Sequence, residues 1–180
     1  MLQHEGDRAR CAVLLPGVRY FSQAPLLWFA RELAQARGWS VVEVDERAPE
    51  DRKPFEWMRE TAERALAAAA GAELVVVVGK SLGSAAAPLV RGPAVWLTPL
   101  LIRPEIVAAL EATEAPTLLV GSPDDPTWGD GRVPRNEAVE VLELPGLDHS
   151  LQVEGDPLAS LDVLRTVTGR LGAFLDDASA

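Results

Sequence analysis

Cysteine and histidine are scarce in this sequence, and their scarcity excludes several kinds of site. Among 180 residues there is one cysteine, Cys11, and there are two histidines, His4 and His149. One cysteine cannot form an intrachain disulfide, and this set is too small for a zinc cluster. Because Cys11 begins an apolar run, we expect it to be a small residue of the core.

Basic residues and long apolar runs are also few. Seventeen lysines and arginines stand against 27 acidic residues, which gives a net charge of −10 and a pI near 4.7. Nucleic acid and anionic membranes repel such a chain, so we expect neither as a partner. No apolar run approaches the roughly 20 residues that span a bilayer. The polar first ten residues, MLQHEGDRAR, lack the apolar stretch of a signal peptide, which favours a cytoplasmic location.

The length of the chain and its hydrophobic content suit one compact domain. Hydrophobic residues make up 48% and charged residues 24%, as in ordinary globular proteins. We therefore expect a single domain over residues 1–180, with residues 1–9 as a flexible polar tail in which His4 is solvated. The composition leaves the oligomeric state open.

Six short apolar runs, several of them apolar on both faces, predict strands of a buried parallel sheet. The runs are Cys11–Leu15, Val41–Val44, Leu74–Val78, Ala94–Thr98, Thr117–Val120 and Val139–Leu144.

Helical patterns separate these runs. Apolar residues recur at helical spacing in four segments, residues 26–33, 54–70, 104–111 and 158–174. A proline stands near the start of each segment, and Asp156 is a candidate N-cap of the last one. Alternating strands and helices predict an α/β fold, a three-layer α/β/α sandwich around a mostly parallel sheet of about six strands.

The third apolar run leads directly into Gly79-Lys80-Ser81-Leu82-Gly83. A G-x-S-x-G sequence between a strand and a helix is the nucleophile elbow, in which a tight turn exposes the serine hydroxyl above the sheet. The amide that follows the serine, from Leu82, can donate to an oxyanion. Lys80 is expected at the surface.

Two other interpretations of this motif are weaker. A phosphate-binding loop needs a glycine at position 74, where the sequence has leucine. A chance match would seldom fall at a strand-to-helix junction.

An activated serine needs a base, and the base needs an orienting acid. His149 follows the last predicted strand, where the chain order Ser, Asp, His places the base. The acid is expected after the preceding strand, in Gly121-Ser122-Pro123-Asp124-Asp125-Pro126. Both Asp124 and Asp125 are candidates at this point.

The loop after the first run supplies the expected second oxyanion donor, the amide of Val18 next to Gly17. Three aromatic residues that follow strand ends, Tyr20, Phe21 and Trp128, are candidates for lining the substrate site. Packing under the loops is an equally good explanation for them.

Together these motifs resemble the α/β-hydrolase superfamily over nearly the whole chain. Within it the sequence is similar to small lidless bacterial hydrolases and to the retinoblastoma-binding-protein-type serine hydrolases, which share a Pro-Gly after the first strand, a G-S-x-D-D-P stretch and a late histidine. In that pattern the acid is the aspartate before proline, which implies Asp125, with Asp124 as the alternative. The elbow GKSLG also resembles that of small hydrolases related to testis-expressed and chromatin-complex subunits.

The resemblance implies a minimal hydrolase fold without a cap domain. Two departures stand out: the two N-terminal strands usual in the superfamily are missing, and Pro16-Gly17 replaces the frequent His-Gly of the oxyanion loop.

The expected function is hydrolysis of a small-molecule carboxylic ester, or of a related acyl bond, through an acyl-enzyme. Ser81, His149 and Asp125 form the expected triad, and the Leu82 and Val18 amides the oxyanion hole. This route needs no metal and no organic cofactor. The alternatives are an inactive hydrolase fold that serves as a binding protein, and an acyltransferase that uses the same triad.

Overall fold

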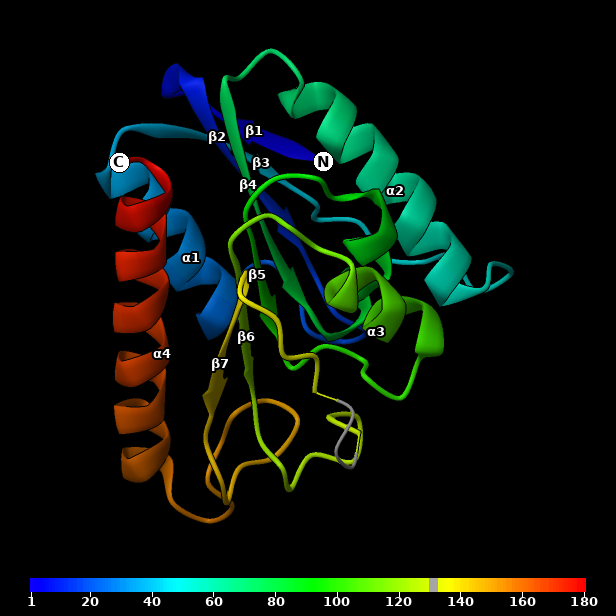
Figure 1. Cartoon of the computed structure of the whole chain (residues 1–180), viewed down its shortest axis with the longest axis vertical. Helices are drawn as coiled ribbons and strands as arrows, with labels where there is room; N and C mark the ends of the chain where they lie inside the picture. The colour runs from blue at the N-terminus through cyan, green and yellow to red at the C-terminus, as the bar shows by residue number, and fades with distance from the viewer. Residues whose placement is uncertain (130–132) are drawn as a thin grey trace.

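In the computed structural model, which describes residues 1–129 and 133–180, the chain forms one seven-stranded sheet with helices on both faces (Figure 1). The strand order is β1-β3-β2-β4-β5-β6-β7, and every neighbouring pair is parallel except β1 and β3. This confirms the expected mostly parallel α/β architecture. The strands are β1 (Leu2–His4), β2 (Asp7–Leu15), β3 (Trp39–Glu43), β4 (Leu74–Lys80), β5 (Ala94–Leu97), β6 (Thr117–Gly121) and β7 (Val139–Glu143).

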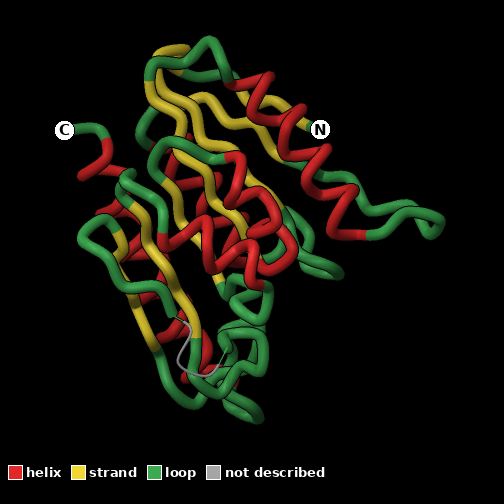
Figure 2. Tube along the Cα trace, turned by 45° about the vertical axis from the view of Figure 1, so that its right-hand side comes forward, coloured by secondary structure: helices red, strands yellow, loops and turns green. Residues whose placement is uncertain are grey.

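The helices form two layers, which can be followed in both views of the backbone (Figures 1 and 2). Helices α1 and α4 pack against each other on one face of the sheet, while α2, α3 and the 3-10 helix η1 cover the other face. The helices are α1 (Pro25–Ala36), α2 (Pro54–Ala69), η1 (Ser81–Leu89), α3 (Pro104–Glu111) and α4 (Pro157–Ala178).

Local sequence signals explain where the helices begin and end. Each of the four α-helices starts with a proline in its first turn, where a missing N–H breaks no helical hydrogen bond. At α4 the side chain of Asp156 also accepts from the amides of Leu158 and Ala159, as expected of an N-cap. Gly38 follows α1 with a positive φ of 76°, a conformation that glycine adopts without strain.

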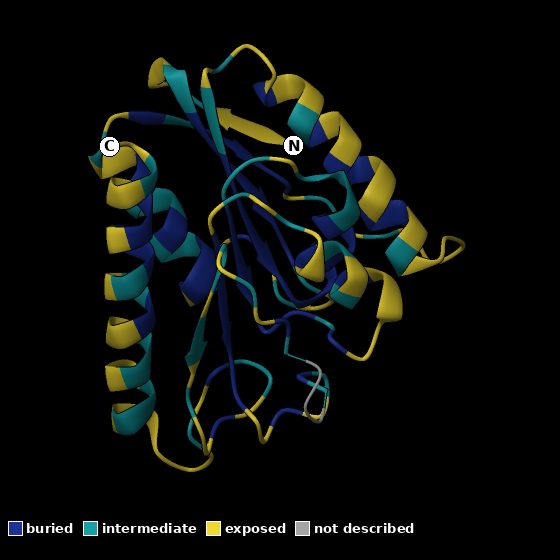
Figure 3. Ribbon diagram, in the orientation of Figure 1, coloured by how far each residue is buried: buried dark blue, intermediate teal, exposed yellow. Residues whose placement is uncertain are grey.

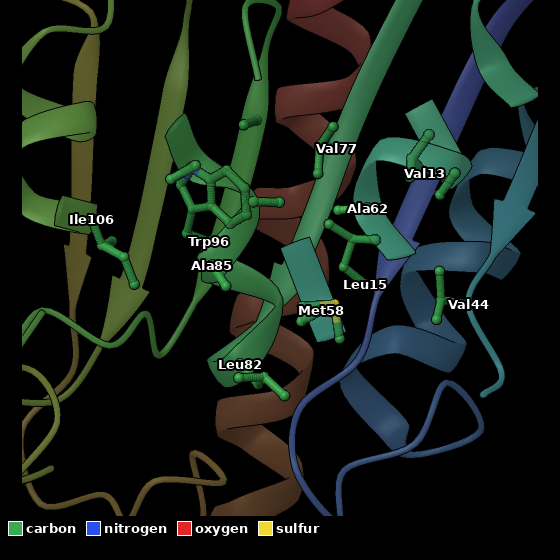
Figure 4. Close-up of a cluster of buried hydrophobic side chains, with 14 of the residues drawn as sticks. Val13, Leu15, Val44, Met58, Ala62, Val77, Leu82, Ala85, Trp96 and Ile106 are labelled. Atoms are coloured by element: carbon green, nitrogen blue, oxygen red, sulfur yellow. The ribbon is translucent and has the colours of Figure 1, made fainter. Parts of the chain in front are cut away.

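The central strands are buried on both faces, so the core has two halves (Figure 3). Figure 4 shows the half under α2, η1 and α3, where Val77 and Trp96 of the sheet face Met58 and Ala85. Cys11 lies in the same half and is 3% exposed, which confirms its expected place in the core.

The N-terminus differs from expectation. Residues 2–4 are not part of a flexible tail but form the edge strand β1, which pairs antiparallel with β3. The imidazole of His4 is not merely solvated, because its Nε2 lies 2.9 Å from Glu43 Oε2. Strand β2 begins at Asp7, before the apolar run that predicted it. The sheet consequently has one strand more than the six expected.

The chain order creates a topological switch point at the carboxyl ends of the strands. Strand β2 pairs with β3 on one side and with β4 on the other, so the connections after β2 and β4 leave the sheet at a point where the strand order reverses. Open α/β sheets bind ligands at such a switch point. The loops at the lower end of Figure 1 are therefore where a functional site is expected.

No cap domain is inserted between β5 and β6, where residues 98–116 form α3 and its two connections. Within the described ranges, no helix combines the length and the apolar character needed to cross a bilayer.

Candidate active site

Ser81 lies at a sharp turn between β4 and η1. Its φ is +50°, a left-handed conformation that is uncommon for serine and that is typical of strained functional turns. The helix that follows is not an α-helix but the 3-10 helix η1, which contains Pro88. The strand-turn-helix context that the motif predicted is present.

Both glycines of the motif are required by close packing. A Cβ on Gly79 would lie 2.5 Å from the Trp96 ring, and a Cβ on Gly83 would lie 2.5 Å from the Leu15 carbonyl oxygen. Ordinary Cβ atoms do not approach other atoms this closely, so only glycine fits at either position without a rearrangement. The two glycines let β4 and η1 approach their neighbours closely enough to form the turn.

Two hydrogen bonds of the Ser84 hydroxyl stabilise the turn. Its hydroxyl donates to the Ser81 carbonyl oxygen at 2.6 Å and accepts from the Leu100 amide at 3.1 Å. The side chain therefore ties the elbow to the connection after β5. In the sequence Ser84 was visible only as a small residue next to the motif.

The imidazole of His149 bridges a hydroxyl and a carboxylate. Its Nε2 lies 2.8 Å from Ser81 Oγ, and its Nδ1 lies 2.6 Å from Asp125 Oδ2. Three loops, which follow β4, β6 and β7, bring these residues together. Hydrogen-bond contact between a hydroxyl, a base and an orienting acid is the arrangement that activates a nucleophile.

Asp125 is held by Thr127 as well as by His149. The amide of Thr127 donates to Oδ1 at 2.9 Å, and Thr127 Oγ1 lies 2.9 and 3.0 Å from the two carboxylate oxygens. Thr127 Oγ1 is also 3.0 Å from His149 Nδ1. Burial alone would raise the pKa of Asp125, but the hydrogen bonds from His149 and Thr127 outweigh it, and the pKa is lowered. The carboxylate is thus kept ionised beside the imidazole.

The neighbouring carboxylate has a different partner. Asp124 is exposed, and its Oδ2 accepts from the Gly146 amide at 2.6 Å. Of the two aspartates that the sequence left as candidates, Asp125 is therefore the one that contacts His149.

Lys80 is buried, contrary to the surface position expected for it. The side chain is 1% exposed, and its Nζ donates to Thr98 Oγ1 at 2.6 Å and to the His149 carbonyl oxygen at 2.7 Å. The ammonium also lies over the ring of Tyr20, 5.1 Å from its centroid. Burial lowers the pKa of Lys80 to about 8, although Asp125 and Asp148 act in the opposite direction. No sequence signal separates such a lysine from a solvated one.

A cavity of about 350 Å³ is lined by Leu82, the residue that follows Ser81, and by the loop after β2, and we call it the elbow cavity. Val18 and Leu82, the two residues whose amides were expected to bind an oxyanion, both line it. Gly17 lies against the serine, because a Cβ there would be 3.1 Å from Ser81 Cβ. The loop after β2 and the start of η1 therefore border the same cavity, and both adjoin Ser81.

The three aromatic candidates lie in different places. Phe21 lines the elbow cavity, together with Trp57, which the sequence analysis did not single out. Tyr20 lines a separate cavity of about 390 Å³ beside α4, and its hydroxyl accepts from the Leu26 amide. Trp128 is 3% exposed, packs on Gly121 and donates from Nε1 to Glu143, so it stands under the loop and lines neither cavity.

Comparison with solved structures identifies the fold. Est1E from Butyrivibrio proteoclasticus, solved with ferulic acid, matches with a TM-score of 0.69 at 13% identity, over 98% of this chain and 94% of that one. The monoacylglycerol lipase of Paleococcus ferrophilus matches with a TM-score of 0.70 at 15% identity, over 96% and 98%. An α/β serine hydrolase without a lid from Xanthomonas campestris matches with a TM-score of 0.64 at 11% identity, over 97% and 83%.

These matches cover nearly the whole chain, and they show that it has the α/β-hydrolase fold. No family model and no curated protein sequence matches it.

Proposed function

We propose that this protein is a serine hydrolase that cleaves a carboxylic ester, or a related acyl bond, through an acyl-enzyme. The observation that carries the proposal is the position of His149, whose two ring nitrogens lie within hydrogen-bond distance of Ser81 Oγ and Asp125 Oδ2. In this proposal Ser81 is the nucleophile, His149 the general base and acid, and Asp125 the residue that fixes the tautomer of the imidazole.

In the first half-reaction, Ser81 Oγ attacks the carbonyl carbon of the ester and its proton passes to His149 Nε2. The amides of Val18 and Leu82 donate to the oxyanion that forms on the carbonyl oxygen. When the intermediate collapses, the bond to the leaving alcohol breaks, and the alcohol takes the proton from His149. The acyl group remains on Ser81.

In the second half-reaction, water attacks the acyl carbonyl and gives a proton to His149 Nε2. The bond between Ser81 Oγ and the acyl carbon breaks, Ser81 regains its proton from the imidazole, and the carboxylic acid leaves. Asp125 stays ionised throughout and stabilises the imidazolium, which agrees with its lowered pKa.

The size of the cavity and the uncovered site favour small soluble esters. The elbow cavity holds about 350 Å³, near the lower end of the roughly 300–1,000 Å³ of small-molecule sites. Solved proteins with this fold include a monoacylglycerol lipase and Est1E with bound ferulic acid, at identities of 15% and 13%. Their shared fold supports the proposal, while the contacts of His149 carry it.

A fluorophosphonate probe tests the proposal, because it labels only an activated serine. We expect the wild-type protein to be labelled and Ser81→Ala to be unlabelled. Ser150→Ala is the matched control, since this serine is next to His149 and its hydroxyl makes no hydrogen bond within the described ranges; it should be labelled like the wild type. Equal labelling of the wild type and Ser81→Ala would exclude Ser81 as the nucleophile. An unreactive wild-type protein would favour the binding-protein alternative.

A further inference from the structure

The elbow cavity combines an apolar wall with a cationic rim. Its wall includes Val18, Phe21, Trp57 and Leu82, and the arginines that line it are Arg19, Arg47 and Arg52. Three arginines around one opening stand out in a chain whose net charge is −10. Their local positive potential attracts an anion where the protein as a whole repels one.

Two of the three arginines are available to a ligand. Arg52 is occupied by an ion pair with Glu60, with an N···O distance of 2.7 Å. Within residues 1–129 and 133–180, neither Arg19 nor Arg47 has an ion-pair partner.

The two carboxylates that line the cavity differ in how far they oppose this charge. Glu46 is already neutralised by the Met1 ammonium at 2.8 Å and by Arg64 at 3.0 Å. Glu50, which is exposed, also borders the cavity and offsets part of the positive charge. The rim therefore keeps an excess of positive charge.

Arg47 is held in place by an aromatic ring. Its guanidinium carbon lies 4.0 Å from the centroid of the Phe21 ring, a cation–π contact between two residues that line the same cavity. The N–H groups of a guanidinium lie in its own plane and remain free to donate to a carboxylate. Because the contact already restricts the side-chain conformations of Arg47, less conformational entropy is lost when it binds a ligand.

Arg19 occupies a backbone position that suits glycine or asparagine better. It lies in the tight turn closed by the hydrogen bond from the Gly17 amide to the Tyr20 carbonyl, and its φ is +58°. This left-handed conformation is strained for a residue with a long side chain, and the backbone alone gives no reason for an arginine here. The turn nevertheless places an arginine next to Val18, the proposed oxyanion donor.

We propose that the elbow cavity binds an acyl group that ends in a carboxylate, as in a half ester of a dicarboxylic acid. The ester carbonyl lies at Ser81, the methylene chain lies along Val18, Phe21, Trp57 and Leu82, and the distal carboxylate binds Arg19 and Arg47. This inference rests on the proposed function and names the substrate class of the same site.

Matched p-nitrophenyl esters test this preference, because they differ only at the far end of the acyl group. The half ester of adipic acid carries a carboxylate there, the hexanoate a methyl group and the aminohexanoate an ammonium. We expect kcat/KM to be about tenfold higher for the adipate than for the hexanoate at low salt, and lowest for the aminohexanoate. The ratio should fall as the salt concentration rises.

Substitutions assign the preference to the two arginines. In Arg19→Gln/Arg47→Gln the ratio of kcat/KM for adipate to that for hexanoate should fall toward one, and Arg47→Glu should reverse the preference in favour of the aminohexanoate. Arg103→Gln is the matched control, because Arg103 also lies over a phenylalanine ring, that of Phe55, but does not line the cavity. It should keep the wild-type ratio. Circular dichroism confirms that each variant is folded.

Other outcomes separate the failure of this inference from failure of the proposed function. Turnover that needs Ser81 but shows an adipate-to-hexanoate ratio of one or less overturns the inference alone. An adipate-to-hexanoate ratio that is unchanged in Arg19→Gln/Arg47→Gln overturns it too. So does a preference for a carboxylate on the leaving group alone, which would appear as faster turnover of p-carboxyphenyl hexanoate without faster turnover of the adipate ester.

A binding measurement decides the case in which no ester is turned over. Monomethyl adipate should raise the Tm of Ser81→Ala more than methyl hexanoate does, and the difference should disappear in Ser81→Ala/Arg47→Glu. That result would support the site while the proposed hydrolysis fails. Equal effects of the two esters would overturn the site as well.

Discussion

Lys80 Nζ donates a 2.7 Å hydrogen bond to the backbone carbonyl oxygen of His149. The bond joins the residue before Ser81 to the loop that carries the imidazole, across 69 positions of sequence. The same ammonium also donates to Thr98 Oγ1 after β5. One buried side chain thus links three of the loops at the carboxyl edge of the sheet, and its removal should disturb the spacing between Ser81 and His149.

Replacement of Lys80 by methionine should reduce catalysis more than substrate binding. Lys80→Met keeps the volume of the side chain but leaves the His149 carbonyl and the Thr98 hydroxyl without their donor, which costs about 1–3 kcal/mol for each buried group. We expect kcat to fall about tenfold or more with a smaller change in KM, because a shifted imidazole affects proton transfer. Steady-state kinetics measure this. Lys53→Met, at an exposed lysine, is the control; an unchanged kcat in Lys80→Met would refute the role.

The lowered pKa of Lys80 predicts a pH dependence of stability. Its pKa is about 8 in the folded chain, and the ordinary value is 10.5. Between pH 8 and pH 10.5 the folded state has therefore lost a proton from Lys80 that the unfolded state still holds. The free energy of unfolding of the wild type should therefore rise with pH relative to Lys80→Met, by about 3 kcal/mol over this window. Urea unfolding at several pH values measures the difference, and a flat or falling difference would contradict the prediction.

The adjacent aspartates provide a matched pair of substitutions. Asp125→Asn should lower kcat about a thousandfold, because an amide neither stabilises the imidazolium nor selects the required tautomer. Asp124→Asn should keep kcat within a few-fold of the wild type, since Asp124 accepts from the Gly146 amide and does not contact His149. Rate measurements on both variants, with circular dichroism to confirm folding, check this. Equal losses in the two would remove Asp125 from its proposed role.

Gly83 should be intolerant of any side chain. A methyl group in Gly83→Ala would lie 2.5 Å from the Leu15 carbonyl oxygen, a contact that backbone movement must relieve. We expect the free energy of unfolding to fall by about 1–3 kcal/mol, the cost seen when an extra group is forced into a packed core. Gly169→Ala is the opposite case: a Cβ there meets open space within α4, and stability should rise by about 0.5–1 kcal/mol. Urea denaturation of both variants checks the sign of each change.

Sequence patterns predicted the main elements because the signals for them are local. Strands β2 to β7 and helices α1 to α4 are each buried on one or two faces. This burial appears in the sequence as apolar runs in the strands and as apolar residues at helical spacing in the helices. Strand β1 was missed because it lies at the edge of the sheet and has no buried apolar face. Its backbone pairing with β3 holds it in place, and such pairing leaves no apolar pattern in the sequence. The chain order of the strands indicated where Ser81, Asp125 and His149 lie, and their catalytic roles remain predictions.

The sequence by itself determined the alternation of strands and helices, the glycines of the elbow and the small set of residues able to act as nucleophile, base and acid. Only the tertiary structure decided that Asp125 and not Asp124 contacts His149, that Thr127 braces this contact, and that Lys80 is buried between loops. It also placed Arg19 and Arg47 at one cavity. These relationships join residues from separate loops, and their distances depend on how the sheet edge brings the loops together, which no local pattern of residues encodes.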